Sequence, residues 1–127
     1  MELLYIDSDI DSPEIIFDPE NNKFEIKGRS LLINAVEFYA PVIEWLEEYI
    51  KAPNKSTCFD VTLEYLNSST VRKLVEIFVL LETLMENGYD IKVNWYYYEL
   101  DEIIMEKGEE IKSVVYLPFN IIEIASE

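Results

Sequence analysis

The sequence contains no histidine, the side chain most often used for proton transfer near neutral pH. It therefore holds neither a Ser-His-Asp nor a Cys-His catalytic arrangement, and it offers no imidazole ligand to a metal ion. Acid–base catalysis would require a carboxylate with a strongly shifted pKa. We expect no catalytic residue, no cofactor site and no metal site, and hence a protein that is not an enzyme.

Cysteine and glycine are almost as scarce. Cys58 is the single cysteine, so the chain can form neither an intramolecular disulfide nor a thiolate zinc site. Its position in the apolar run 57–61 predicts a buried, small hydrophobic side chain. The three glycines, Gly28, Gly88 and Gly108, are too widely spaced to build a phosphate-binding loop.

Basic residues are also few, with 10 Lys and Arg against 26 Asp and Glu, a net charge of −16. Such a chain repels nucleic acids and anionic membrane surfaces, because both are bound chiefly through Lys and Arg. Proteins, or small molecules at a carboxylate site, are the expected partners. We find no signal peptide and no apolar run of roughly 18 residues that would insert into a membrane, so we expect a cytoplasmic protein.

Half of the 127 residues are hydrophobic, which predicts a folded chain. A single domain over residues 1–127 can bury about two-thirds of its unfolded surface. Short apolar or alternating segments predict strands at 3–6, 15–17, 23–27, 57–66 and 91–98, and an edge strand or extended segment at 116–124. Residues 15–17 and 23–27 are expected to form a β-hairpin.

Helical spacing of apolar residues predicts three helices. The first begins near Asn34, with Glu37 placed for a capping box, and Pro41 is expected to kink it or delay its regular part. The second runs through residues 71–85, and the third from 99 to about 112, irregular near Gly108. Strands separated by helices require parallel pairing. The prediction is an α/β sandwich with a mixed, partly parallel sheet.

One acidic segment superficially resembles a calcium-binding loop. Asp7, Asp9 and Asp11 alternate as in the first half of such a loop. Ser12 stands where the loop has glycine, however, and Asp18 where it has a bidentate glutamate. We interpret the segment as a solvated acidic turn.

The second acidic segment supports an alternative function. Asp101 and Glu102, with further carboxylates at 106, 109 and 110, could hold Mg²⁺ or form an acid–base pair. The chain would then be a small carboxylate-based metal-binding protein or enzyme. The simpler interpretation is an exposed helix face, with Asp101 and Glu102 favoured at a helix N-terminus.

The most informative segment is a predicted strand-to-helix turn that contains three hydroxyl residues, Ser68, Ser69 and Thr70. One of them is expected to be the N-cap, and a cap alone is the simplest interpretation. In the alternative interpretation, one hydroxyl is a phosphoacceptor. A phosphate at this turn would meet free helix N–H groups, and Arg72 and Lys73 lie one turn further along.

Six segments of the chain resemble the SiaC family of bacterial regulatory phosphoproteins. In order, they are SPEIIFD (12–18), FEIKGRS (24–30), NAVEFYAPVIEWLEEY (34–49), LEYLNSST (63–70), VNWYYYE (93–99) and LPFN (117–120). The blocks at 34–49 and 93–99 are the most specific. The resemblance implies an architecture similar to the STAS domains of anti-sigma-factor antagonists.

The resemblance also implies a partner-switching function. A cognate kinase of the GHKL type phosphorylates one hydroxyl, a PP2C-like phosphatase removes the phosphate, and the dephosphorylated form binds its target. In the best-known system the target is a diguanylate cyclase, so the output is cyclic-di-GMP signalling and biofilm formation. The family's acceptor directly follows the asparagine of this turn, which implies Ser68, with Ser69 and Thr70 as alternates. The implied partner-binding residues are Asn67, Ser69, Thr70, Arg72 and Lys73.

Overall fold

The computed structural model describes residues 1–126. Its elements, in chain order, are β1 (Leu4–Ile6), β2 (Glu14–Asp18), β3 (Lys23–Ser30), α1 (Ala35–Tyr49), β4 (Ser56–Leu66), α2 (Ser68–Glu86), β5 (Asp90–Tyr98), α3 (Glu102–Lys112) and β6 (Phe119–Ile124). This order of strands and helices is the predicted one, so the prediction is confirmed. The prediction of one domain over residues 1–127 stays a prediction, and its last residue lies outside the described range.

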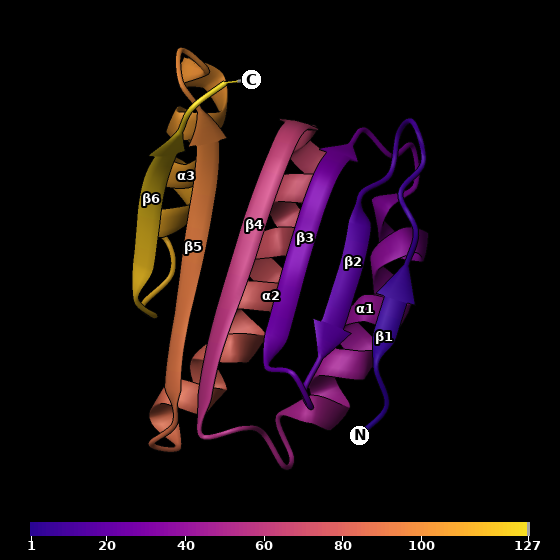
Figure 1. Ribbon diagram of the computed structural model, residues 1–127, viewed down its shortest axis with the longest axis vertical. Coiled ribbons are helices and arrows are strands. Elements are labelled where there is room, and N and C mark those ends of the chain that lie inside the picture. The colour runs from indigo at the N-terminus through magenta and orange to yellow at the C-terminus, as the bar shows by residue number, and fades with distance from the viewer. Residues whose placement is uncertain (127) are drawn as a thin grey trace.

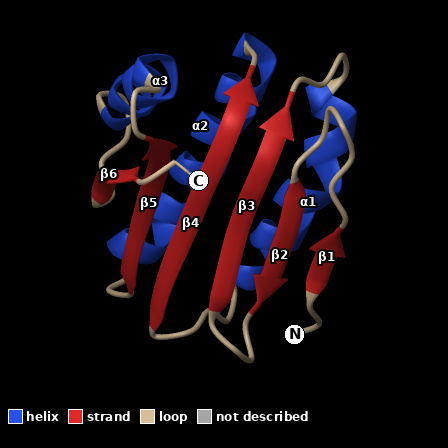
Figure 2. Cartoon of the chain, turned by 45° about the horizontal axis from the view of Figure 1, so that its top comes forward, coloured by secondary structure: helices blue, strands red, loops and turns tan. Residues whose placement is uncertain are grey.

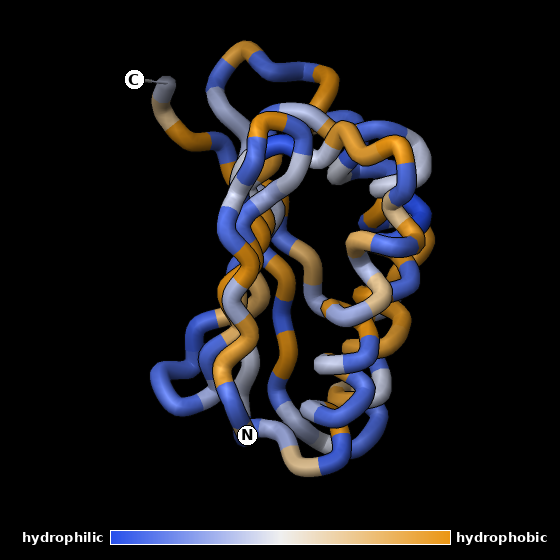
Figure 3. Tube along the Cα trace, turned by 90° about the vertical axis from the view of Figure 1, so that its right-hand side faces the viewer, coloured by the Kyte–Doolittle hydropathy of each residue, from blue (hydrophilic) through white to orange (hydrophobic). Residues whose placement is uncertain are grey.

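The six strands form one mixed sheet in which each strand lies next to its neighbours in the chain, from β1 to β6. The pairs β1–β2 and β2–β3 are antiparallel, and the three pairs from β3 to β6 are parallel. The predicted hairpin is β2–β3, in which Phe17 pairs with Phe24. All three helices cover the same face of the sheet, so the molecule has two layers (Figures 1 and 3).

The core lies between these two layers. Alternation along each strand sends every second side chain toward the helices, and Phe17, Phe59 and Trp95 are fully buried there. Phe17 packs against Phe59 with ring centroids 5.3 Å apart, and Trp45 of α1 stacks on Tyr49 at 5.4 Å. Aromatic rings therefore fill much of the space between the sheet and the helices.

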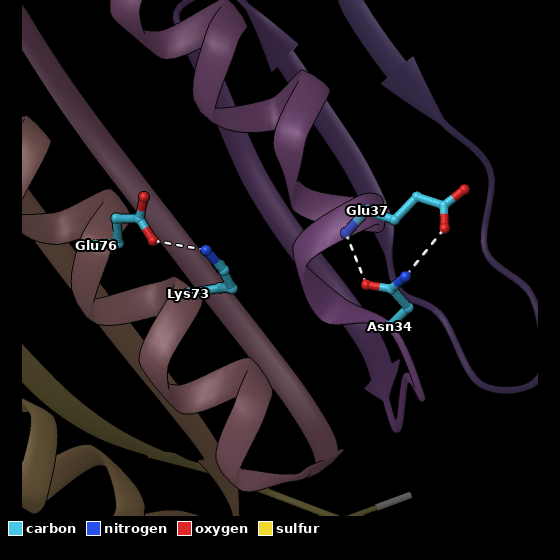
Figure 4. A network of polar contacts seen from close by, with 4 residues as sticks. All are labelled: Asn34, Glu37, Lys73 and Glu76. Carbon is cyan, nitrogen blue, oxygen red and sulfur yellow. Dashed lines mark hydrogen bonds and ion pairs between the residues drawn. The ribbon is translucent and has the colours of Figure 1, made fainter.

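Helix α1 begins as predicted. The Oδ1 atom of Asn34 accepts a hydrogen bond from the Glu37 N–H at 3.1 Å, and the Asn34 side-chain amide donates to Glu37 Oε2 at 3.1 Å (Figure 4). Pro41 lies inside a helix that is already regular from Ala35 onward, so the regular part is not delayed. The helix ends before Ile50, its C-cap.

Two predictions about the third helix were wrong. It begins at Glu102, three residues later than predicted, because Asp101 caps it by accepting a hydrogen bond from the Ile104 N–H at 3.2 Å. It also continues through Gly108 without irregularity. A Cβ atom at Gly108 would lie 2.5 Å from Cδ1 of Trp95, so glycine is required here by close packing of the helix on β5.

The prediction that Cys58 is a buried hydrophobe was also wrong. In β4 its neighbours Thr57 and Phe59 face the helices, so Cys58 lies half-buried on the opposite face of the sheet. Its thiol lies 3.7 Å from Oδ1 of Asp60 and accepts a hydrogen bond from the Asn94 amide at 3.2 Å. Burial and the Asp60 carboxylate raise the pKa of this thiol, which keeps it protonated and weakly nucleophilic.

Candidate functional site

The turn with the three hydroxyls, residues 67–70, is called the hydroxyl turn below. It lies at the end of the sheet where the parallel strands β3, β4 and β5 all finish (Figure 2). Asn67 separates the last residue of β4 from the first residue of α2. Its N–H donates to the carbonyl of Ser30, the last residue of β3, at 3.3 Å, and its side-chain amide donates to the Leu32 carbonyl at 3.0 Å. The turn is therefore attached to the neighbouring strand as well as to its own helix.

Asn67 is the N-cap of α2, which corrects the prediction that one of the three hydroxyls caps the helix. Its Oδ1 atom accepts hydrogen bonds from the N–H of Thr70 and the hydroxyl of Ser69, both at 3.0 Å. The backbone of Asn67 is extended, with φ −106° and ψ 174°, as an N-cap requires. The capping residue therefore comes one position before the first hydroxyl residue, Ser68, which is the first residue of the helix.

The three hydroxyls differ in accessibility. Thr70 is fully buried, and its Oγ1 lies 2.8 Å from the hydroxyl of Ser30 and 2.9 Å from Oδ1 of Asn67. Ser69 is half-buried and donates its hydroxyl proton to Asn67. Ser68 is exposed, and its Oγ has no hydrogen-bond partner within residues 1–126. Of the three, Ser68 is the one that an enzyme can reach without disturbing the turn.

The two predicted cations are placed differently. Arg72 is exposed and lies four residues after Ser68, on the same face of the helix, and it forms no ion pair within the described part of the chain. Lys73 points elsewhere and pairs with Glu76 at 2.9 Å (Figure 4). The first turn of α2 carries no acidic residue. Together with the free N–H groups of the helix start, Arg72 makes this turn favourable for an anion.

Large apolar side chains are exposed around the same end of the sheet, and we call them the apolar rim. They come from the connections that follow β3 and β5, the end of β4 and the first turns of α1 and α3: Ile33, Val36, Tyr65, Leu100 and Ile103. Exposed apolar residues that gather in one region commonly mark a surface that binds another protein. Sequence reasoning missed this rim, because these residues are far apart in the chain.

The acidic segments are not arranged as metal sites. The carboxylates of Asp7 and Asp9 accept hydrogen bonds from the next backbone N–H groups, those of Ser8 and Ile10. Asp101 is occupied as a helix cap. Within residues 1–126 no three Cys, Asp or Glu side chains converge to hold a metal ion. No described helix is both long enough and apolar enough to span a membrane.

Known proteins of similar sequence and structure place this geometry in a family. An uncharacterized protein of Pseudomonas aeruginosa is 28% identical over 121 residues, which cover 95% of this chain and 96% of that protein. The structure of SiaC of Pseudomonas aeruginosa matches with a TM-score of 0.88 and 27% identity, covering 98% of this chain and 100% of SiaC.

A further match is a chain in the crystal structure of the diguanylate cyclase SiaD in complex with its activator SiaC, also from Pseudomonas aeruginosa. Its TM-score is 0.86 with 28% identity, covering 95% of this chain and 99% of that one. The model of the SiaC family regulatory phosphoproteins matches residues 6–124. From its sequence segments, its six-stranded mixed sheet and this match, the chain belongs to the SiaC family of regulatory phosphoproteins.

Proposed function

We propose that this chain is a non-enzymatic, cytoplasmic partner-switching protein whose phosphoacceptor is Ser68. The observation that carries the proposal is the unequal accessibility of the three hydroxyls, since Ser68 alone is both exposed and free of internal hydrogen bonds. A cognate kinase of the GHKL type transfers the γ-phosphoryl group of ATP to the Ser68 hydroxyl. A PP2C-like phosphatase hydrolyses the resulting ester and restores the hydroxyl.

The dephosphorylated protein binds and activates a diguanylate cyclase, and so acts in cyclic-di-GMP signalling and biofilm regulation. The similarity to SiaC, which is the activator of the diguanylate cyclase SiaD in their complex, supports this target. The binding surface includes the turn and the start of α2. In this surface Arg72 is free to contact the partner, Ser69 and Thr70 hold the turn through Asn67, and Lys73 is held by Glu76.

Phosphorylation blocks this contact without unfolding the protein. A phosphate on Ser68 brings nearly two negative charges to the helix N-terminus, where free N–H groups and Arg72 stabilise it. The phosphate is therefore held in place on the binding surface. A partner that fits the bare hydroxyl then meets a bulky, strongly hydrated group, which it would have to desolvate.

Phosphopeptide mass spectrometry after incubation with the cognate kinase and ATP tests the acceptor. We expect phosphate on Ser68, none in the Ser68→Ala variant, and wild-type phosphate uptake in the matched control Ser69→Ala. Full uptake by Ser68→Ala would show that Ser68 is not the acceptor.

Synthesis of cyclic-di-GMP by the cognate cyclase tests the output. We expect the dephosphorylated protein to stimulate synthesis and the Ser68→Asp variant to lose most of that stimulation. Ser68→Asn has nearly the same shape as Ser68→Asp but no charge, and it should retain more of the stimulation. If Ser68→Asp activates the cyclase as well as the wild-type protein does, the inhibitory effect of charge at this position is disproved.

A further inference from the structure

Strands β4 and β5 diverge near the end at which the hydroxyl turn lies. Their pairing stops at Thr62 and Tyr96, although β4 continues to Leu66 and β5 to Tyr98 (Figure 1). Over these last residues each strand remains paired on its other side, β4 with β3 and β5 with β6. The divergence opens a groove of about 720 Å³ between the two strands.

Apolar side chains line both sides of this groove. Leu66 lies on the β4 side, and Tyr98 and Ile103 lie on the side of β5 and α3. The side chain of Ile103 is 70% exposed, so a large part of its apolar surface is open to water. The groove therefore offers a partly apolar slot between two strands that are not paired with each other there.

Carboxylates accompany the apolar residues on each side. Glu64 of β4 and Asp101 of the α3 cap line the groove, and neither forms an ion pair within residues 1–126. Lys27 is the one basic residue among the described lining residues. With two carboxylates against one lysine, this partly apolar slot carries a net negative charge, which complements an aliphatic side chain flanked by a lysine or arginine.

A leucine next to the groove is almost fully exposed. Leu100 has φ +72°, in a turn closed by the hydrogen bond from the Asp101 N–H to the Tyr98 carbonyl at 3.0 Å, and 93% of it is exposed. The turn's hydrogen bonds stabilise this backbone, whereas packing within the described residues leaves the apolar surface exposed. Burial against a bound segment would compensate for the exposure.

We propose that this groove is the docking site for a segment of a partner protein that inserts an aliphatic side chain between Leu66 and Ile103 and places a lysine or arginine against Glu64 and Asp101. The assignment of this partner as the regulated target rests on the proposed function. Ser68 lies two residues beyond Leu66 in the chain.

Nuclear magnetic resonance titration of the full, unphosphorylated chain with three synthetic hexapeptides tests the groove directly. The probe is acetyl-Ser-Lys-Leu-Leu-Lys-Ser-amide; in one control Glu replaces both lysines, and in the other Ser replaces both leucines. We expect the probe to shift backbone amide signals of residues 64–66 and 98–104, with an affinity about tenfold above either control. Equal affinities, shifts confined to other residues, or no shifts at millimolar probe would each overturn the proposal.

Matched variants separate the charges from the apolar slot. Glu64→Gln combined with Asp101→Asn removes both charges but keeps an N-cap at position 101, and it should abolish the preference for the lysine peptide over the glutamate peptide. Ile103→Ala should weaken binding of both. Val114→Ala, near the opposite end of α3 and 57% exposed, is the control and should change neither.

The same variants distinguish this proposal from the proposed function, because the peptide titration needs neither kinase nor cyclase. If Ile103→Ala activates the cyclase as strongly as the wild-type protein does, the proposed docking role of the groove is overturned and the proposed switch is left intact. If the protein binds the peptide in the groove but fails to activate the cyclase, the docking role of the groove stands and the cyclase is not the regulated target.

Discussion

The hydroxyl oxygens of Ser30 and Thr70 lie 2.8 Å apart in the protein interior, although the two residues are 40 positions apart in the sequence. The Ser30 hydroxyl also lies 2.9 Å from the phenolic oxygen of Tyr39, and all three side chains are fully buried. This chain of hydroxyls connects the end of β3, helix α1 and the first turn of α2. The turn that carries Ser68 is thus held in position from inside the core.

Replacing Thr70 by valine should show how much this connection contributes to stability. Valine keeps the shape but removes the hydroxyl, which leaves buried acceptors on Ser30 and Asn67 with one partner fewer. We expect the free energy of unfolding to fall by about 1–3 kcal/mol, measured by urea denaturation. Ser69→Ala, whose hydroxyl is half-buried, is the control and should change it by less. An unchanged stability of Thr70→Val would contradict the assigned role.

Tyr39 should make stability depend on pH in the alkaline range. Burial raises the pKa of its hydroxyl from the ordinary value of 10 to about 12, and the hydrogen bond with Ser30 opposes part of that rise. The folded state therefore keeps a proton that the unfolded state loses. The contribution of this group is complete below pH 10 and declines as the pH rises to 12, by about 2–3 kcal/mol in total.

Urea denaturation at several pH values between 9 and 12 measures this effect. Other tyrosines ionise in the same range, so the informative quantity is the difference between the wild-type protein and Tyr39→Phe. We expect that difference to shrink as the pH rises, because phenylalanine has no proton to lose. A difference that stays constant from pH 9 to 12 would show that Tyr39 ionises equally in both states.

Gly108→Ala should destabilise the protein even though alanine favours helices. The added Cβ would lie 2.5 Å from Cδ1 and 2.6 Å from Nε1 of Trp95. The indole cannot easily move, because it is fully buried and donates a hydrogen bond to the Ile104 carbonyl at 2.9 Å. Overpacking of this kind costs about 1–3 kcal/mol, more than the gain in helix propensity of about 1 kcal/mol.

Thermal unfolding followed by tryptophan fluorescence measures the cost of Gly108→Ala. The control is Glu109→Ala, at the neighbouring exposed position of the same helix, which we expect to change the midpoint by a degree or two at most. A midpoint of Gly108→Ala at or above the wild-type value would mean that helix and indole separate more easily than their contact indicates.

Leu100→Asn should stabilise the isolated protein and weaken its binding to a partner. Asparagine adopts the left-handed conformation more readily than leucine does, so we expect the free energy of unfolding to rise by up to about 1 kcal/mol. Leu100→Ala is the matched control, since it removes the same apolar surface but keeps the strained backbone. Calorimetry gives the stability, and titration with the partner gives the affinity, which should fall in both variants.

The strands and helices were predictable because buried, apolar residues recur in the sequence with the period of a strand or a helix. In β4, Phe59 and Val61 face the helices while Asp60 and Thr62 face the other way, as period-two alternation predicted. The start of α1 was equally clear, since Asn34 and Glu37 are three residues apart and interact with each other. Such signals are local, and local geometry is enough to interpret them.

The errors arose where distant residues decide the outcome. Asparagine, serine and threonine all cap helices, and Asn67 takes this role through its contacts with Ser30, at the end of β3, and Leu32, in the connection that follows it. The helix was predicted to be irregular near Gly108, because Trp95, the neighbour in space that explains this glycine, belongs to β5. The groove escaped notice for the same reason, since the position at which two parallel strands stop pairing has no signature in either strand.

The consecutive order of the strands has a consequence for how the protein is made. Each strand pairs with its immediate neighbours in the chain, so a chain synthesised from its N-terminus can complete the sheet strand by strand. Ser30 and Tyr39 both precede Ser68, so the partners that hold its turn are already present when α2 emerges from the ribosome. The β5 and α3 side of the groove is synthesised later. We therefore expect a nascent chain to form the turn that carries Ser68 before the groove is complete.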